Sequence, residues 1–264
     1  MRTTWWVLAA AVVSAATGVN AATVTNTSPT VTQNFNTLAF QGTTNSFAAW
    51  ATSTGQAWQQ TSNLGLPAGG QYIASNGGST QGSIYSFGAT NSTERALGSV
   101  ASGSTATLYY GLLVSNGGTT AITELAIAYV GEQWRNGGNT TAHTLAFEYS
   151  TTATTIGAVS GYIAVPSLDF TGPIATSTAS SLDGNLPANR VSISGVITGL
   201  NILPGQSVRI RWVDINDAGN DHGLAIDDFA LTARFAPDVQ DIPLPAAAVA
   251  APGLLALTAL RRRR

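Results

Sequence analysis

The chain has 264 residues, contains no cysteine, and carries 11 basic and 13 acidic residues. Disulfides, thiolate metal sites and a cysteine nucleophile are therefore excluded. Between residues 22 and 241, six arginines stand against all thirteen acids, a formal charge of −7, so counterion release cannot favour nucleic acid as a partner.

The first predicted element is a secretory signal peptide at residues 1–21. Arg2 precedes an uncharged apolar run at residues 5–16, and small residues follow at positions 19 and 21, where signal peptidase reads the chain. We expect signal peptidase to cut after Ala21. An uncleaved anchor helix, the alternative, needs an apolar stretch of about 20 residues. The rest of the chain is therefore expected to be exported.

Residues 22–235 are predicted to form a single all-β domain, an antiparallel β-sandwich or jelly roll. Apolar residues recur at every second position in short runs, as in strands with one buried face. Clusters of glycine and asparagine separate the runs, as expected of turns. The clearest apolar faces are Leu108, Tyr110, Leu112 and Val114; Leu145, Phe147 and Tyr149; and Val208, Ile210 and Trp212, the last alternating with Arg209 and Arg211 on a charged face.

Four tryptophans follow the signal peptide, and Trp212 is expected in the core because it alternates with charged neighbours. Trp50 and Trp58 lie in polar, turn-rich sequence, and Trp134 follows a polar Gly-Glu-Gln block. Aromatic rings can stack on sugar faces, so Trp50, Trp58 and Trp134 are candidate carbohydrate-binding residues. Packing in the core or at the edge of the sandwich is the alternative, since each ring buries a large apolar area.

The sequence shows no group of residues that together could carry out catalysis, and no catalytic residue is assigned. The chain has two histidines, and no serine lies in a Gly-x-Ser-x-Gly elbow. Glu94 and Glu132 are the obvious carboxylate pair for a glycosidase. Each has an arginine close in sequence, Arg95 and Arg135, and structural ion pairs are the commoner explanation of such clusters. A non-enzyme is expected.

An oxygen-rich loop begins at residue 214, and beyond it the apolar positions change from even to odd numbers at Asp227-Asp228. This change predicts a β-bulge that turns one aspartate inward, where an unpaired carboxylate is unfavourable. Because Ca²⁺ takes six to eight oxygen ligands, we predict a structural Ca²⁺ site, with an ordinary surface turn as the alternative. The candidate ligands are Asp214, Asn216, Asp217, Asp221, Asp227 and Asp228.

The C-terminal part changes composition abruptly. A linker at residues 236–241 is followed by Ile242, Pro243, Leu244 and Pro245, an uncharged segment at 246–260, and the closing arginines Arg261, Arg262, Arg263 and Arg264. The apolar segment is expected to enter the membrane as a short helix while the arginines stay on the cytoplasmic side. Fifteen helical residues rise about 22 Å, less than the ~30 Å hydrocarbon core. The segment is therefore expected to be a temporary stop.

Residues 242–264 resemble the PEP-CTERM sorting signal in its Val-Pro-Leu-Pro-Ala form. Ile242 stands where that pattern usually has valine, and Leu244 replaces the glutamate of the commoner form. The resemblance implies processing by an exosortase-type membrane enzyme in a Gram-negative-type bacterium that makes exopolysaccharide. The protein would be held briefly at the inner membrane and then reach the cell surface or the extracellular space.

The body of the chain also resembles a recurrent domain of exported bacterial proteins. That group has no established activity, and the resemblance implies a jelly-roll-like surface domain. The blocks that carry the resemblance are residues 34–39, 85–88, 93–98, 129–135, 168–170, 211–214 and 224–228.

Together these features predict a non-catalytic exported protein of the cell surface or extracellular matrix, with exopolysaccharide as its candidate ligand. Two alternatives stay open: a purely structural envelope component, and a carbohydrate-active enzyme of the glycoside hydrolase type.

Overall fold

The computed structural model describes residues 21–64 and 70–238. The signal peptide predicted at residues 1–21, apart from its last residue, and the sorting tail predicted at 242–264 lie outside the described residues. The predicted linker is described as far as residue 238. In the described part of the chain, no helix has the length and apolar composition that crossing a membrane requires.

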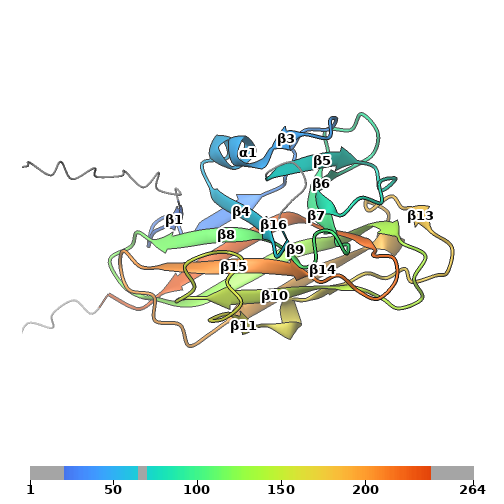
Figure 1. Ribbon diagram of the computed structural model, residues 1–264. Coiled ribbons are helices and arrows are strands. Elements are labelled where there is room, and N and C mark those ends of the chain that lie inside the picture. The colour runs from blue at the N-terminus through green and yellow to red at the C-terminus, as the bar shows by residue number, and fades with distance from the viewer. Residues whose placement is uncertain (1–20, 65–69, 239–264) are drawn as a thin grey trace, which may run out of the picture.

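The described residues form two β-sheets that lie against each other as layers (Figure 1). In sheet A the strand order is β1-β8-β15-β10-β11, with β4 also beside β8 and β12 also beside β10. Its strands are β1 (Ala22–Val24), β4 (Ala57–Ser62), β8 (Leu108–Asn116), β10 (Thr144–Ser150), β11 (Ile163–Ala164), β12 (Phe170–Thr171) and β15 (Ser207–Asp214).

Sheet B has the order β13-β9-β16-β7-β6-β5-β3, with β14 also beside β9 and β2 also beside β16. Its strands are β2 (Thr30–Gln33), β3 (Asn45–Ser46), β5 (Gln71–Ser75), β6 (Ser83–Phe87), β7 (Ala96–Val100), β9 (Ile122–Asn136), β13 (Ser180–Ser181), β14 (Arg190–Ile197) and β16 (Gly223–Phe235). One α-helix, α1 (Phe47–Ser53), and two 3₁₀ turns, Pro166–Leu168 and Pro187–Asn189, complete the described elements.

The core lies between the two sheets and is centred on Trp212 of β15, which is fully buried. Its ring centroid lies 5.3 to 6.3 Å from five other aromatic rings, contributed by both sheets. These rings are Trp58, Tyr110, Tyr129, Phe147 and Phe229. The all-β sandwich predicted from the alternation is therefore confirmed, and so is the core position of Trp212.

Two features of the sheets differ from the prediction. The pairs β1–β8 and β5–β6 are parallel, whereas an antiparallel sandwich was expected. Side chains alternate in the same way in both kinds of pair, so alternation does not reveal strand direction.

The predicted charged face of β15 is also wrong at Arg211, which is 4% exposed. The segment between β10 and β11 covers it: the Arg211 guanidinium donates to the carbonyls of Ile156 and Ala158 and lies 3.5 Å from the centroid of the Tyr162 ring. Glu148 on the neighbouring strand completes an ion pair at 2.6 Å. A charge that has a partner and hydrogen-bond acceptors can be buried.

The bulge predicted at Asp227-Asp228 is confirmed. The ladder between β16 and β9 pairs Asp227 with Val130 and then Ala230 with Ala128, so two residues of β16 oppose one of β9. Asp228 is the extra residue, exposed and with φ +47°, and Asp227 is buried. The bulge keeps the core positions on both sides of it facing the other sheet.

Candidate functional site

The acidic loop joins the end of β15 to the start of β16 and spans residues 215–222. The backbone N–H of Asp217 donates to Asp221 Oδ1 at 2.9 Å, which closes the loop on itself. Gly219 within it has φ +98°, a conformation that residues with a Cβ rarely adopt. The loop is thus folded around the buried side chain of Asp221.

His143, the last residue before β10, lies close to two aspartates of this loop. Its Nδ1 lies 3.3 Å from Asp217 Oδ2 and 3.7 Å from Asp221 Oδ1. The same Nδ1 accepts a hydrogen bond from the backbone N–H of His222 at 3.2 Å, so it carries no proton in this arrangement. Burial lowers the pKa of His143 and raises the pKa of Asp221 to about 6.

These groups form a mixed nitrogen and oxygen donor set, with one ligand atom from each within 4.8 Å of the others. Ca²⁺ prefers oxygen ligands, and a set that includes imidazole is better suited to transition metals. The chain's own N–H groups already engage both His143 Nδ1 and Asp221 Oδ1. Two of the three candidate ligand atoms are therefore already hydrogen-bonded without a cation.

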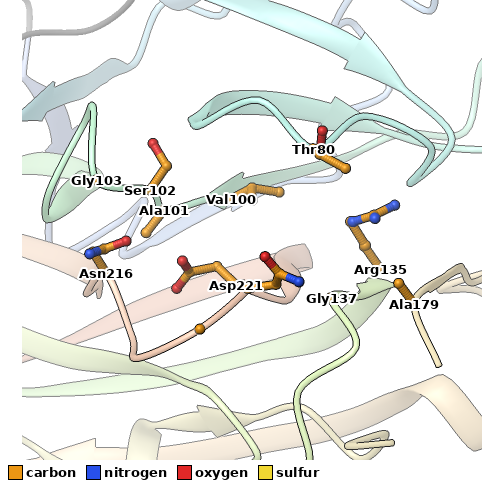
Figure 2. Close-up of a pocket in the computed structure, with 12 residues that line it drawn as sticks. Thr80, Val100, Ala101, Ser102, Gly103, Arg135, Gly137, Ala179, Asn216 and Asp221 are labelled. Atoms are coloured by element: carbon orange, nitrogen blue, oxygen red, sulfur yellow. The ribbon is translucent and has the colours of Figure 1, made fainter. Parts of the chain in front are cut away.

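A pocket of about 460 Å³ lies next to this cluster. Figure 2 shows Asn216 and Asp221 on one side of it, Ser102 and Thr80 on the other, and Arg135 at one end. Asn216 and Asn220 are exposed, and both line the pocket. Hydroxyl, amide, guanidinium and carboxylate groups from four separate segments thus face one cavity.

The six residues predicted as metal ligands do not converge on one point. Asp217 and Asp221 meet at His143, and Asn216 faces the pocket. Asp214 is buried and accepts a hydrogen bond from Ser99 Oγ at 2.7 Å.

Asp227 lies elsewhere, on sheet B, where one oxygen comes within 4.8 Å of oxygens of Glu94 and Glu132. Asp228 is beside it on the bulge. Sequence reasoning did not place Glu94 and Glu132 near Asp227, since both are remote from it along the chain. Glu132 and Trp134 are two residues apart on one strand, and this spacing was the available signal that their side chains share a face of the sheet.

The ion pairs predicted for these glutamates, with Arg95 and Arg135, are wrong. Glu132 instead lies 4.0 Å from Arg190 of β14. Arg95 donates to Ser86 and to backbone carbonyls, and Arg135 donates to the carbonyl of Gly77.

The three tryptophans predicted to bind carbohydrate are buried: Trp50 is 4% exposed, Trp58 3% and Trp134 1%. Trp50 and Trp58 pack on each other and on Phe35. Trp134 stacks on Phe87 at 6.2 Å. No face of these indoles is free for a sugar, so this part of the prediction is corrected to core packing.

No protein-family model matches this chain, and no curated protein matches it. Among solved structures, the chain is similar to the K2 cleaved adhesin domain of Lys-gingipain, with a TM-score of 0.38 and 13% identity over 77% of this chain and 97% of that one. It is similar to the CBM22-1 xylan-binding domain from Paenibacillus barcinonensis Xyn10C, with a TM-score of 0.37 and 12% identity over 78% and 95%. It is also similar to TmCBM61 in complex with β-1,4-galactotriose, with a TM-score of 0.30 and 11% identity over 67% and 88%. At these values no family follows, and function is inferred from the chain's own residues.

Proposed function

We propose that this chain is an exported, non-catalytic surface or matrix protein that binds a polysaccharide through the pocket beside the acidic loop. The observation that carries the proposal is the lining of that pocket, where exposed amides and hydroxyls gather around one carboxylate and one guanidinium. Such groups donate and accept hydrogen bonds in the paired geometry that neighbouring sugar hydroxyls offer.

Binding is favoured over hydrolysis because of the acids at the site. Among the described residues that line the pocket, Asp221 is the only carboxylic acid. Hydrolysis of a glycosidic bond generally needs two carboxyl groups on either side of the bond. One oxygen of Asp221 also accepts a hydrogen bond from the backbone of its own loop. This bond fixes the carboxylate in place, as suits a residue that binds a ligand.

Export is part of the proposal and depends on the two ends of the chain. The apolar run behind Arg2 would direct translocation, and signal peptidase would remove it. The tail at residues 242–264 would hold the protein at the inner membrane until an exosortase-type enzyme releases it. The pocket would then face extracellular polymer, which makes exopolysaccharide of the producing cell the natural candidate ligand.

A retention assay tests the binding. The full chain, purified from the producing cells, is mixed with insoluble exopolysaccharide from the same cells, and the protein left in solution is measured. The test variant is Asn216→Ala combined with Asn220→Ala. Both side chains are exposed, and the structure gives neither a hydrogen bond within the described residues, so folding should be unchanged. Loss of two hydrogen bonds is expected to weaken binding roughly tenfold.

Asn201→Ala is the matched control, an exposed amide near Ile202, which pairs with Ile122 at the opposite end of β9 from the pocket. It should bind like the unchanged chain. Equal retention of both variants would place the ligand elsewhere, and no retention of the unchanged chain would favour a purely structural role. Release of soluble sugar from the polymer would show that the chain is an enzyme.

A further inference from the structure

A second acidic cluster lies on the face of sheet B that is turned away from the sandwich core. Glu132 and Trp134 of β9 both lie on this face, and Asp227 of β16 lies on it next to the bulge. Glu94, in the turn before β7, is the third carboxylate. One oxygen from each of the three carboxylates lies within 4.8 Å of the other two.

Three carboxylate oxygens of the cluster have no hydrogen-bond partner among the described residues. Glu132 is fully buried and Asp227 is 5% exposed. Within the described part of the chain, Glu132 Oε1 and Asp227 Oδ1 accept no hydrogen bond, and the same holds for Glu94 Oε1. A buried carboxylate oxygen without a partner is strongly unfavourable, so three of them together require a positive charge or protons.

The second oxygen of Glu132 and the second oxygen of Glu94 each accept a hydrogen bond from a neighbouring side chain. Trp134 Nε1 donates to Glu132 Oε2 at 2.9 Å, and Asn185 Nδ2 donates to Glu94 Oε2 at 2.5 Å. In metal sites, hydrogen bonds to the outer atoms of the ligands commonly orient the inner atoms toward the ion. The pattern at Glu94 and Glu132 is the same: one oxygen is fixed by the protein and the other is left free.

Nearby arginines do not neutralise the cluster. Arg190 Nε lies 4.0 Å from Glu132 Oε1, at the outer limit of an ion pair, and its side chain is 33% exposed. Arg95 is close to Glu94, but its guanidinium is used by Ser86 and by backbone carbonyls. Asp228, the extra residue of the bulge, adds a further negative charge. The arginines therefore leave the carboxylates to be balanced by a cation or by protons.

From this geometry we infer that Glu94, Glu132 and Asp227 form a buried Ca²⁺ site that ties the turn before β7 to β9 and to the bulge of β16. All ligands are oxygens, as Ca²⁺ prefers. Ligands on opposite sides of one Ca²⁺ lie about 4.6 to 5.2 Å apart, so three oxygens that all lie within 4.8 Å of one another can ligate the same ion.

Without a cation, the three carboxylates would have to share protons. The site is separate from the pocket proposed to bind polysaccharide, and its existence does not depend on that proposal.

Calorimetry and thermal unfolding of the full chain test the site, using Ca²⁺ alone as the probe after treatment with EDTA and with no polysaccharide present. Ca²⁺ is expected to bind with measurable heat and to raise the melting temperature of the unchanged chain. Glu132→Gln and Asp227→Asn keep the shape of the side chains and should each weaken Ca²⁺ binding by roughly tenfold or more. Gln at position 132 can still accept the Trp134 hydrogen bond.

Asp221→Asn is the matched control, because it removes a carboxylate from the acidic loop and should leave the Ca²⁺ response in place. The inference is overturned if Ca²⁺ neither binds nor stabilises the unchanged chain, which would mean that the cluster shares protons. It is equally overturned if Asp221→Asn abolishes the response and Glu132→Gln keeps it.

Luminescence of Tb³⁺ gives a readout that does not depend on altering a ligand. Trp134 touches Glu132 through its indole N–H, so excitation of tryptophan should sensitise Tb³⁺ at the site, and Ca²⁺ should displace it. Trp134→Phe should lose most of this emission. Full emission in that variant would place the bound ion away from Glu132 and refute the site.

Discussion

Asp214 offers a direct test of how burial controls ionisation in this domain. It ends β15, is 3% exposed and accepts a hydrogen bond from Ser99 Oγ at 2.7 Å. Burial raises its pKa to about 8 from an ordinary 3.8, with Asp221 and Asp217 adding repulsion. The folded protein thus keeps a proton on Asp214 that the unfolded chain releases near pH 4.

The sign of the effect follows from this difference. Because the folded pKa lies above the unfolded one, the folded state binds the extra proton between about pH 4 and pH 8. Its contribution to stability is complete below pH 4 and is lost as the pH rises to 8. Each pKa unit corresponds to about 1.4 kcal/mol, so the loss amounts to about 6 kcal/mol at most. A domain of this kind has a total stability of about 5–15 kcal/mol.

Asp214→Asn fixes the neutral state and keeps an oxygen for Ser99. Its free energy of unfolding should match that of the unchanged chain at pH 4 and exceed it by about 2–5 kcal/mol at pH 9. Urea unfolding in EDTA at a series of pH values measures this difference, and the subtraction removes the contributions of the other acids and of the histidines. Glu124→Gln, which breaks the exposed pair with Arg234, is the control and should change stability by about 1 kcal/mol or less. A difference that does not vary with pH would refute the reasoning.

Two further predictions concern packing. Trp212→Leu should lower the free energy of unfolding by about 3 kcal/mol, because five aromatic rings of both sheets lose their common neighbour; urea unfolding that shows a loss below about 1 kcal/mol would contradict a core centred there. Gly131→Ala should lower the melting temperature, since an added Cβ would lie 2.3 Å from the Phe170 ring. In a double-mutant cycle with Phe170→Leu, much of this cost should disappear, and fully additive effects would show that the clash is not the cause.

The sandwich was predictable because its signal is local. One-sided burial imposes an alternation that reads directly from the sequence, and β8, β10 and β15 bury the faces that it indicated. The bulge was predictable for the same reason, since an extra residue shifts the alternation by one. The sequence did not predict the features that depend on contacts with segments far away along the chain. The burial of Arg211 depends on the segment before β11, and the burial of Trp50 and Trp58 depends on Phe35, which packs on both rings.

The ion pairs of the candidate site could not be predicted from the sequence for the same reason. Glu132 and Arg135 are three residues apart on β9, but the ladder with β16 shifts register between them, so their spacing alone does not tell whether their side chains share a face. The ion pair that Glu132 makes is with Arg190, its cross-strand partner on β14. At 4.0 Å this arginine is a weak counter-charge for a fully buried carboxylate that also faces Asp227. The bulge was expected to turn an aspartate inward, and it instead adds Asp227 to the group of carboxylates on the outer face of sheet B, where we infer the Ca²⁺ site.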